Sequence, residues 1–201
     1  VFHTETEMGA LPVNTATYGN NSFKLAGLFG PQNYSTQSSG IPYVLPLASQ
    51  AESGHTYAAY DIPTIAEMSA KAIEILSQNP KGFVLMIEGS QIDFAGHVNL
   101  IEQNVQETLA MDDAVAQAVT WTNNRTDTLL LVTADHECGG LEVLKDNGAG
   151  SYPTVSWKWG SHTNANVPVM AWGVNANVVN AKSFDNTSIF NLMLGTLFAV
   201  R

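Results

Sequence analysis

The sequence predicts an α/β protein with three layers, in which helices cover both faces of a mostly parallel sheet. Two continuous apolar runs, 82–87 and 129–133, are too short for helices and are typical of strands buried on both faces. Between them, apolar residues recur with a helical period over 100–122. A strand, a helix and a second strand in this order indicate a right-handed parallel crossover. A third apolar run at 167–172 and a helical pattern at 187–200 complete the three layers.

One more helix precedes the first of these strands. Asp61 and Pro63 mark its start, apolar residues recur on one face, and Asn79 and Pro80 end it. The remaining segments are an unassigned start (1–21), a short buried strand (23–29), a long loop (32–60) and a loop excursion (140–161).

The composition describes an acidic protein with enough apolar residues to fold around a core. The 201 residues include 18 acidic and 8 basic side chains, which gives a formal charge of −10, and 45% are hydrophobic. Nucleic-acid binding is not expected, because phosphate contacts need clustered basic residues and the arginines are Arg125 and Arg201 alone. No apolar stretch reaches the roughly 18 to 20 residues that span a bilayer, and the first residues lack the features of a signal peptide.

Carboxylate and imidazole side chains gather where the predicted strands end. In open α/β sheets this edge holds the ligand crevice. Asp93, His97 and His162 form a triplet that suits zinc, since three protein ligands with one open position are typical of a catalytic site. If the segment after Glu88 is helical, Asp93 and His97 stand four residues apart on one face. The candidate metal ligands are Glu88, Asp93, His97, Asp135, His136 and His162.

Two further ions are compatible with this set. Asp135 and His136 can begin a second site, because two ions about 3.5 to 4 Å apart clamp both oxygens of a displacement at phosphorus. Glu88 supplies only oxygen, which suits magnesium. Taken singly, each of these side chains is more often a solvated or capping group.

Three other reactive side chains are expected to have no role in a site. His3 and His55 lie in aperiodic polar segments and are expected at the surface. Cys138, the single cysteine, is expected to be a small buried side chain rather than a nucleophile.

Four blocks of the sequence resemble ordered motifs of the alkaline phosphatases. They are FVLMIEGSQIDFAGH (83–97), ETLAMDDAV (107–115), LVTADHECGG (131–140) and HTNANVPV (162–169). By this resemblance Asp93, His97 and His162 are ligands of a first zinc, Asp135 and His136 ligands of a second zinc, and Glu88 a ligand of magnesium.

The resemblance also implies a fold and a reaction. The family has a large, mostly parallel sheet between helical layers, and it hydrolyses phosphomonoesters through a phosphoserine. The resemblance covers the family's C-terminal half, from about Leu25 onward, so 1–201 is expected to be half of one such domain. The family's serine nucleophile in an Asp-Ser-Ala setting and its phosphate-binding arginine have no match here, since the chain contains no Asp-Ser dipeptide.

Ligand number leads to the same expectation. Asp135 and His136 offer a second zinc two ligands where three or four are normal, and Glu88 alone cannot hold magnesium. The chain is therefore expected to work only with an N-terminal half and to be inactive in isolation. A related metal-dependent phosphodiesterase, or a non-catalytic fragment that keeps the metal scaffold, are the alternatives. The resemblance further implies a possible homodimer and a periplasmic or extracellular location.

Overall fold

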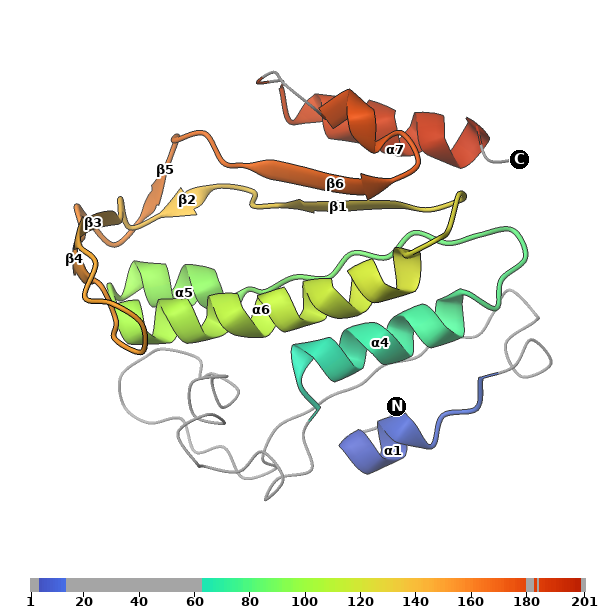
Figure 1. Ribbon diagram of the computed structural model, residues 1–201, viewed down its shortest axis with the longest axis horizontal. Coiled ribbons are helices and arrows are strands. Elements are labelled where there is room, and N and C mark those ends of the chain that lie inside the picture. Colours follow the sequence, from blue (N-terminus) through green and yellow to red (C-terminus); the bar gives the residue numbers. More distant parts are fainter. Residues whose placement is uncertain (1–3, 14–62, 180–182, 184, 200–201) are drawn as a thin grey trace.

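The structure is a computed structural model that describes residues 4–13, 63–179, 183 and 185–199 (Figure 1). The predicted strand at 23–29, the long loop at 32–60, His3 and His55 lie outside these residues. In chain order the elements are α1 (Glu5–Gly9), α4 (Ile65–Leu76), α5 (Gln91–His97), α6 (Ile101–Thr122), β1 (Leu129–Thr133), β2 (Glu137–Cys138), β3 (Glu142–Lys145), β4 (Thr154–Ser156), β5 (His162–Thr163), β6 (Val169–Gly173), the 3-10 helix η2 (Ala176–Val179) and α7 (Thr187–Ala199).

Strands β1 to β6 form one nested antiparallel ribbon, which we call the β-ribbon. The chain runs outward through β1, β2 and β3 and returns through β4, β5 and β6 (Figure 1). The innermost pair is β3 with β4, followed by β2 with β5 and then β1 with β6. The register places Cys138 opposite His162 and Glu137 opposite Thr163. Residues that are distant in sequence thus face each other in pairs.

The strand pairs that the structure describes are antiparallel, whereas the sequence predicts a mostly parallel sheet; the predicted parallel pair of 82–87 with 129–133 is not tested, because no strand is assigned at 82–87. β1 and β6 run in opposite directions, with Leu129 opposite Gly173 and Thr133 opposite Val169. Parallel strands need a crossover connection, usually a helix, whereas the chain between β1 and β6 contains only the inner strands of the ribbon. The predicted loop excursion at 140–161 contains the hairpin of β3 and β4.

The sequence predicts a buried strand at 82–87, and the described structure assigns no strand there. The side chains of this segment alternate, since Phe83, Leu85 and Ile87 are half-buried whereas Val84 and Met86 are 57% and 87% exposed. A period of two is typical of extended backbone with one covered face. The prediction of burial on both faces is therefore also wrong.

Helices lie on both sides of the outer strand pair. Figure 1 shows α7 beyond β6, and α6 with α4 on the side of β1. Helix α6 contacts α4, α5 and β1, and it buries Ala114 and Ala118. These small residues allow close packing of the helices, as does the buried Ala95 of α5. None of the described helices is long and apolar enough to cross a membrane.

Sequence periodicity locates the helices well. The predicted helix at 100–122 corresponds to α6 (Ile101–Thr122), and that at 187–200 corresponds to α7 (Thr187–Ala199). The helix predicted after Asp61 and Pro63 is α4, which begins after Thr64. The strands at 129–133 and 167–172 correspond to β1 and, within two residues at its start, to β6.

A capping box defines the start of α4. The Thr64 hydroxyl accepts a hydrogen bond from the Glu67 amide at 3.2 Å, and the Glu67 carboxylate accepts one from the Thr64 amide at 2.7 Å. Two backbone donors that the helix leaves unpaired are satisfied in this way.

We predict that Thr64→Ala lowers the free energy of unfolding by about 1 kcal/mol, because the hydroxyl acceptor of the cap is lost. Thr64→Ser keeps that acceptor and should leave the stability nearly unchanged. Urea denaturation followed by circular dichroism measures both variants. Equal stability of the Ala and Ser variants would show that the cap contributes nothing.

Candidate metal centre

Helix α5 places Asp93 and His97 on one face. They are four residues apart, and the Asp93 Oδ2 and His97 Nε2 atoms are 3.2 Å apart. The predicted helical turn after Glu88 is confirmed by α5. The Asn104 side chain donates to the Ile92 carbonyl at 3.0 Å and so ties α5 to α6. Gly96 allows β2 to approach, because a Cβ there would be 3.0 Å from the Cβ of Cys138.

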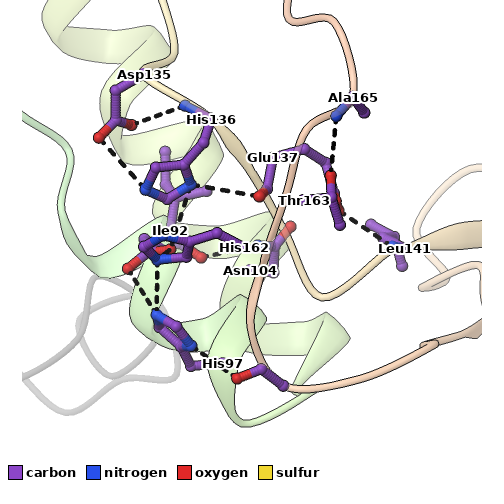
Figure 2. Close-up of polar contacts among 12 residues, drawn as sticks. Ile92, His97, Asn104, Asp135, His136, Glu137, Leu141, His162, Thr163 and Ala165 are labelled. Carbon is purple, nitrogen blue, oxygen red and sulfur yellow. Dashed lines mark hydrogen bonds and ion pairs between the residues drawn. The ribbon is translucent and has the colours of Figure 1, made fainter.

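Strand β5 brings His162 to the same place from the far limb of the β-ribbon. Its Nε2 atom lies 3.4 Å from Asp93 Oδ1 and 3.0 Å from His97 Nε2. Figure 2 shows the rings of His136, His162 and His97 following one another. Three residues that the sequence predicts as a triplet are thus adjacent, although β5 begins 65 residues after His97.

A backbone carbonyl on the far side of the His97 ring fixes the orientation of that ring. Its Nδ1 lies 2.9 Å from the carbonyl oxygen of Gly160, which can only accept, so Nδ1 donates to it and Nε2 is the ring nitrogen that faces Asp93 and His162. Position 160 must be glycine, because a Cβ there would be 2.6 Å from the His97 carbonyl oxygen. The chain before His162 therefore passes directly over the end of α5.

The donor set fits a divalent cation. Ligand atoms of Asp93, His97, Cys138 and His162 all lie within 4.8 Å of one another. Asp93 Oδ1 is buried and has no hydrogen-bond partner among the described residues. Two imidazole Nε2 atoms face each other at 3.0 Å, and their lone pairs repel unless a proton or a cation lies between them. A carboxylate with two neutral imidazoles is a set that zinc prefers.

His136 and Asp135 lie beside this group. The His136 ring stacks on His162 with 3.5 Å between centroids, and its Nδ1 is 3.9 Å from Asp93 Oδ1. Asp135 Oδ2 is 3.3 Å from His136 Nε2, while the Asp135 side chain is 87% exposed. His136 therefore adjoins the triplet, whereas Asp135 adjoins His136 and is turned toward solvent.

Glu88 is not part of the four-residue group. It is exposed at the end of the extended segment that precedes α5. Within the described ranges, close contacts link five of the six predicted ligands, and Glu88 makes no hydrogen bond or ion pair with them.

Two residues of the site receive no site role from sequence reasoning. The sequence predicts an inert buried thiol at Cys138, yet its sulfur joins the four-residue group and its side chain is half-buried. Burial, followed by the neighbouring Asp93 carboxylate, raises the pKa of the Cys138 thiol to about 12, which keeps it protonated at neutral pH.

Glu137 is the other residue, and its carboxylate accepts three hydrogen bonds around the β2–β5 pair. The sequence feature that could have identified Glu137 is the nearby Gly139-Gly140 pair, which favours a tight turn.

Comparisons with known proteins give a consistent result. The family model described as alkaline phosphatase matches residues 13–152. Alkaline phosphatase of Escherichia coli is 34% identical over 153 residues, covering 68% of this chain and 32% of that protein. Alkaline phosphatase H of Pseudomonas aeruginosa is 32% identical over 191 residues, covering 85% of this chain and 40% of that protein. The chain thus spans less than half the length of these relatives.

Solved structures agree with the sequence matches. Alkaline phosphatase from the Antarctic bacterium TAB5 aligns with a TM-score of 0.61 at 28% identity, covering 69% of this chain and 44% of that one. The Thermus thermophilus enzyme aligns over 100% of this chain and 56% of that one, with a TM-score of 0.72 at 18% identity, which supports the fold alone. From the family model, the relatives and the shared fold together, we conclude that the chain belongs to the alkaline phosphatase family.

Proposed function

We propose that the chain supplies the metal-binding part of an enzyme that hydrolyses phosphomonoesters through a phosphoserine intermediate. The observation that carries the proposal is the convergence of Asp93, His97 and His162 from α5 and β5. A serine oxygen attacks phosphorus as the bond to the leaving alcohol oxygen breaks. Water then attacks the phosphoserine, which releases phosphate and restores the serine.

We assign two zinc ions and one magnesium ion to the complete site. Asp93, His97 and His162 hold the first zinc, Asp135 and His136 contribute to the second, and Glu88 contributes to magnesium. A structure of a TAB5 alkaline phosphatase variant in which a histidine is replaced by glutamate, 28% identical with a TM-score of 0.61, has magnesium bound in a site called M3. When bound, such ions polarise phosphoryl oxygens and lower the pKa of a coordinated hydroxyl or water.

The chain's own residues hold and orient this centre. The Gly160 carbonyl accepts from His97 Nδ1, and this leaves Nε2 as the nitrogen whose lone pair would bind a metal ion. Asp93 offers both oxygens, with Oδ2 near His97 and Oδ1 near His162. The Asp135 carboxylate faces His136 and is otherwise open to solvent, which leaves room for groups from outside the chain.

A serine-bearing half supplies what these residues lack. The chain has no Asp-Ser dipeptide, and its described arginine, Arg125, pairs with Asp127 at 2.8 Å. We propose that an N-terminal half, on the same or on a separate polypeptide, brings the serine, the phosphate-binding arginine and the missing ligands. A homodimer and a periplasmic or extracellular location belong to the same proposal, by analogy with the family.

We predict that the 201-residue chain alone hydrolyses p-nitrophenyl phosphate negligibly, because it contains no matched nucleophile. Co-expression with a serine-bearing half should produce activity, and bis(p-nitrophenyl) phosphate should be the poorer substrate. Serine-dependent turnover by the isolated chain would contradict the split arrangement. Preference for the diester would favour a phosphodiesterase, and inactivity of a zinc-loaded complete protein would favour a non-catalytic scaffold.

We predict that Asp93→Ala or His162→Ala in the completed enzyme lowers kcat/KM by at least ~100-fold, because each removes one of three ligands around the activating ion. Asp113→Ala, which removes an exposed carboxylate from α6, is the matched control and should retain activity. Zinc content is measured alongside the rates. Near-normal rates with full zinc content in the two site variants would remove these residues from the centre.

A further inference from the structure

We infer that Glu137 is a positioning residue for the metal centre, because its carboxylate fixes both of the segments that orient His97 and His162. The inference rests on the proposed metal-dependent function, and it adds a residue outside the six predicted ligands. Glu137 lies in β2, immediately after His136, and is half-buried.

The Glu137 carboxylate accepts three hydrogen bonds from two different limbs of the β-ribbon. Oε1 accepts from the Leu141 amide at 3.2 Å, and Oε2 accepts from the Gly140 amide at 3.2 Å. Oε2 also accepts from the Thr163 hydroxyl at 2.5 Å. Figure 2 shows Glu137 next to Thr163 and beside the histidine group, with a dashed line leading to Leu141. Hydrogen bonds to an ionised acceptor are shorter and stronger than neutral ones, so the carboxylate holds the turn after β2 and strand β5 together.

The first route from Glu137 leads to His162. Thr163 follows His162 directly, and among the described strands the two-residue β5 pairs with β2 alone. A pair of strands this short has few backbone hydrogen bonds with which to hold its register. The Glu137–Thr163 hydrogen bond adds a side-chain link across the same pair, and it keeps His162 opposite Cys138.

The second route leads to His97. The two amides of Gly140 and Leu141 hold a turn in which Gly139 has φ of 86°. The Gly139 carbonyl accepts from the Lys158 amide at 2.9 Å, and the Gly139 amide donates to the Ser161 carbonyl at 2.9 Å. This returning stretch contains Gly160, whose carbonyl accepts from His97 Nδ1. Glu137 therefore supports the acceptor that sets the His97 tautomer.

A glutamine at this position cannot reproduce the arrangement. All three partners of Glu137 act as donors in the structure, and two of them are backbone amides that have no acceptor to offer in return. In the Glu137→Gln variant, either orientation of the side-chain amide would direct its NH2 group at a backbone N–H, which leaves a donor unpaired. The carboxylate itself, and not only its size, is what the site requires.

The test measures metal binding rather than turnover. Co2+ is titrated into the 201-residue chain and its absorption bands are recorded, with Zn2+ affinity determined by competition. Loss of partners that orient metal ligands typically weakens binding by about 10- to 100-fold, and we expect this range for Glu137→Gln and Glu137→Ala. Thr163→Val should weaken binding in the same direction, whereas Thr163→Ser, which keeps the hydroxyl, should restore it to within about threefold of the parent chain.

Controls separate positioning from general destabilisation. Glu142→Gln removes the same charge from an exposed position in β3 and should leave affinity and spectrum unchanged. Thermal unfolding of each metal-free variant is recorded, and Thr163→Val together with Glu137→Gln remains informative if Glu137→Ala fails to fold. Parental Co2+ affinity and spectrum in both Glu137→Gln and Thr163→Val would overturn the inference, even if both variants were less stable. A parent chain that binds Co2+ tightly, but gives no monoesterase with a serine-bearing half, would contradict the proposed function alone.

Discussion

The pairing of β2 with β5 is the constraint on which the rest of the site depends. Asp93 and His97 can meet on α5 by helical geometry alone, because they are four residues apart. His162 reaches them only because the outward and returning limbs of the β-ribbon place it opposite Cys138, whose neighbour Gly96 lies on the same helix. A shift of one residue in a strand pair turns a side chain to the opposite face, so this register decides whether a third ligand exists.

The sequence predicts those parts of the fold whose signal is long and periodic. Helix α6 carries about six turns of pattern, and its predicted limits agree with the structure to within one residue. Strands β2 and β5 have two residues each, too few to show any alternation. The strands β3 and β4, of four and three residues, lie within 140–161, where the sequence predicts a loop excursion. The parallel crossover is inferred from buried runs on either side of α6. The structure assigns a strand to 129–133 but none to 82–87, and the pair that 129–133 does form, β1 with β6, is antiparallel.

The candidate site is predictable where residue chemistry is sufficient. Carboxylate and imidazole types identify Asp93, His97 and His162, and the structure brings their ligand atoms together. Glu137 has a carboxylate like Asp93, but its role depends on the backbone amides of a turn: the Gly139-Gly140 pair indicates the turn but not which side chain accepts from its amides. Cys138 joins the group only through the strand pairing. The sequence therefore does not predict the contacts that depend on backbone geometry, which are the turn amides that bind Glu137 and the strand pairing that places Cys138.

The one-sided burial of the segment before α5 has a practical meaning. Met86 presents its thioether to solvent at 87% exposure, next to the half-buried Leu85 and Ile87. Peroxide converts an accessible methionine to its sulfoxide, while a covered one is shielded. The degree of Met86 oxidation, measured in a tryptic digest, therefore reports whether another stretch of polypeptide covers the exposed face of this segment.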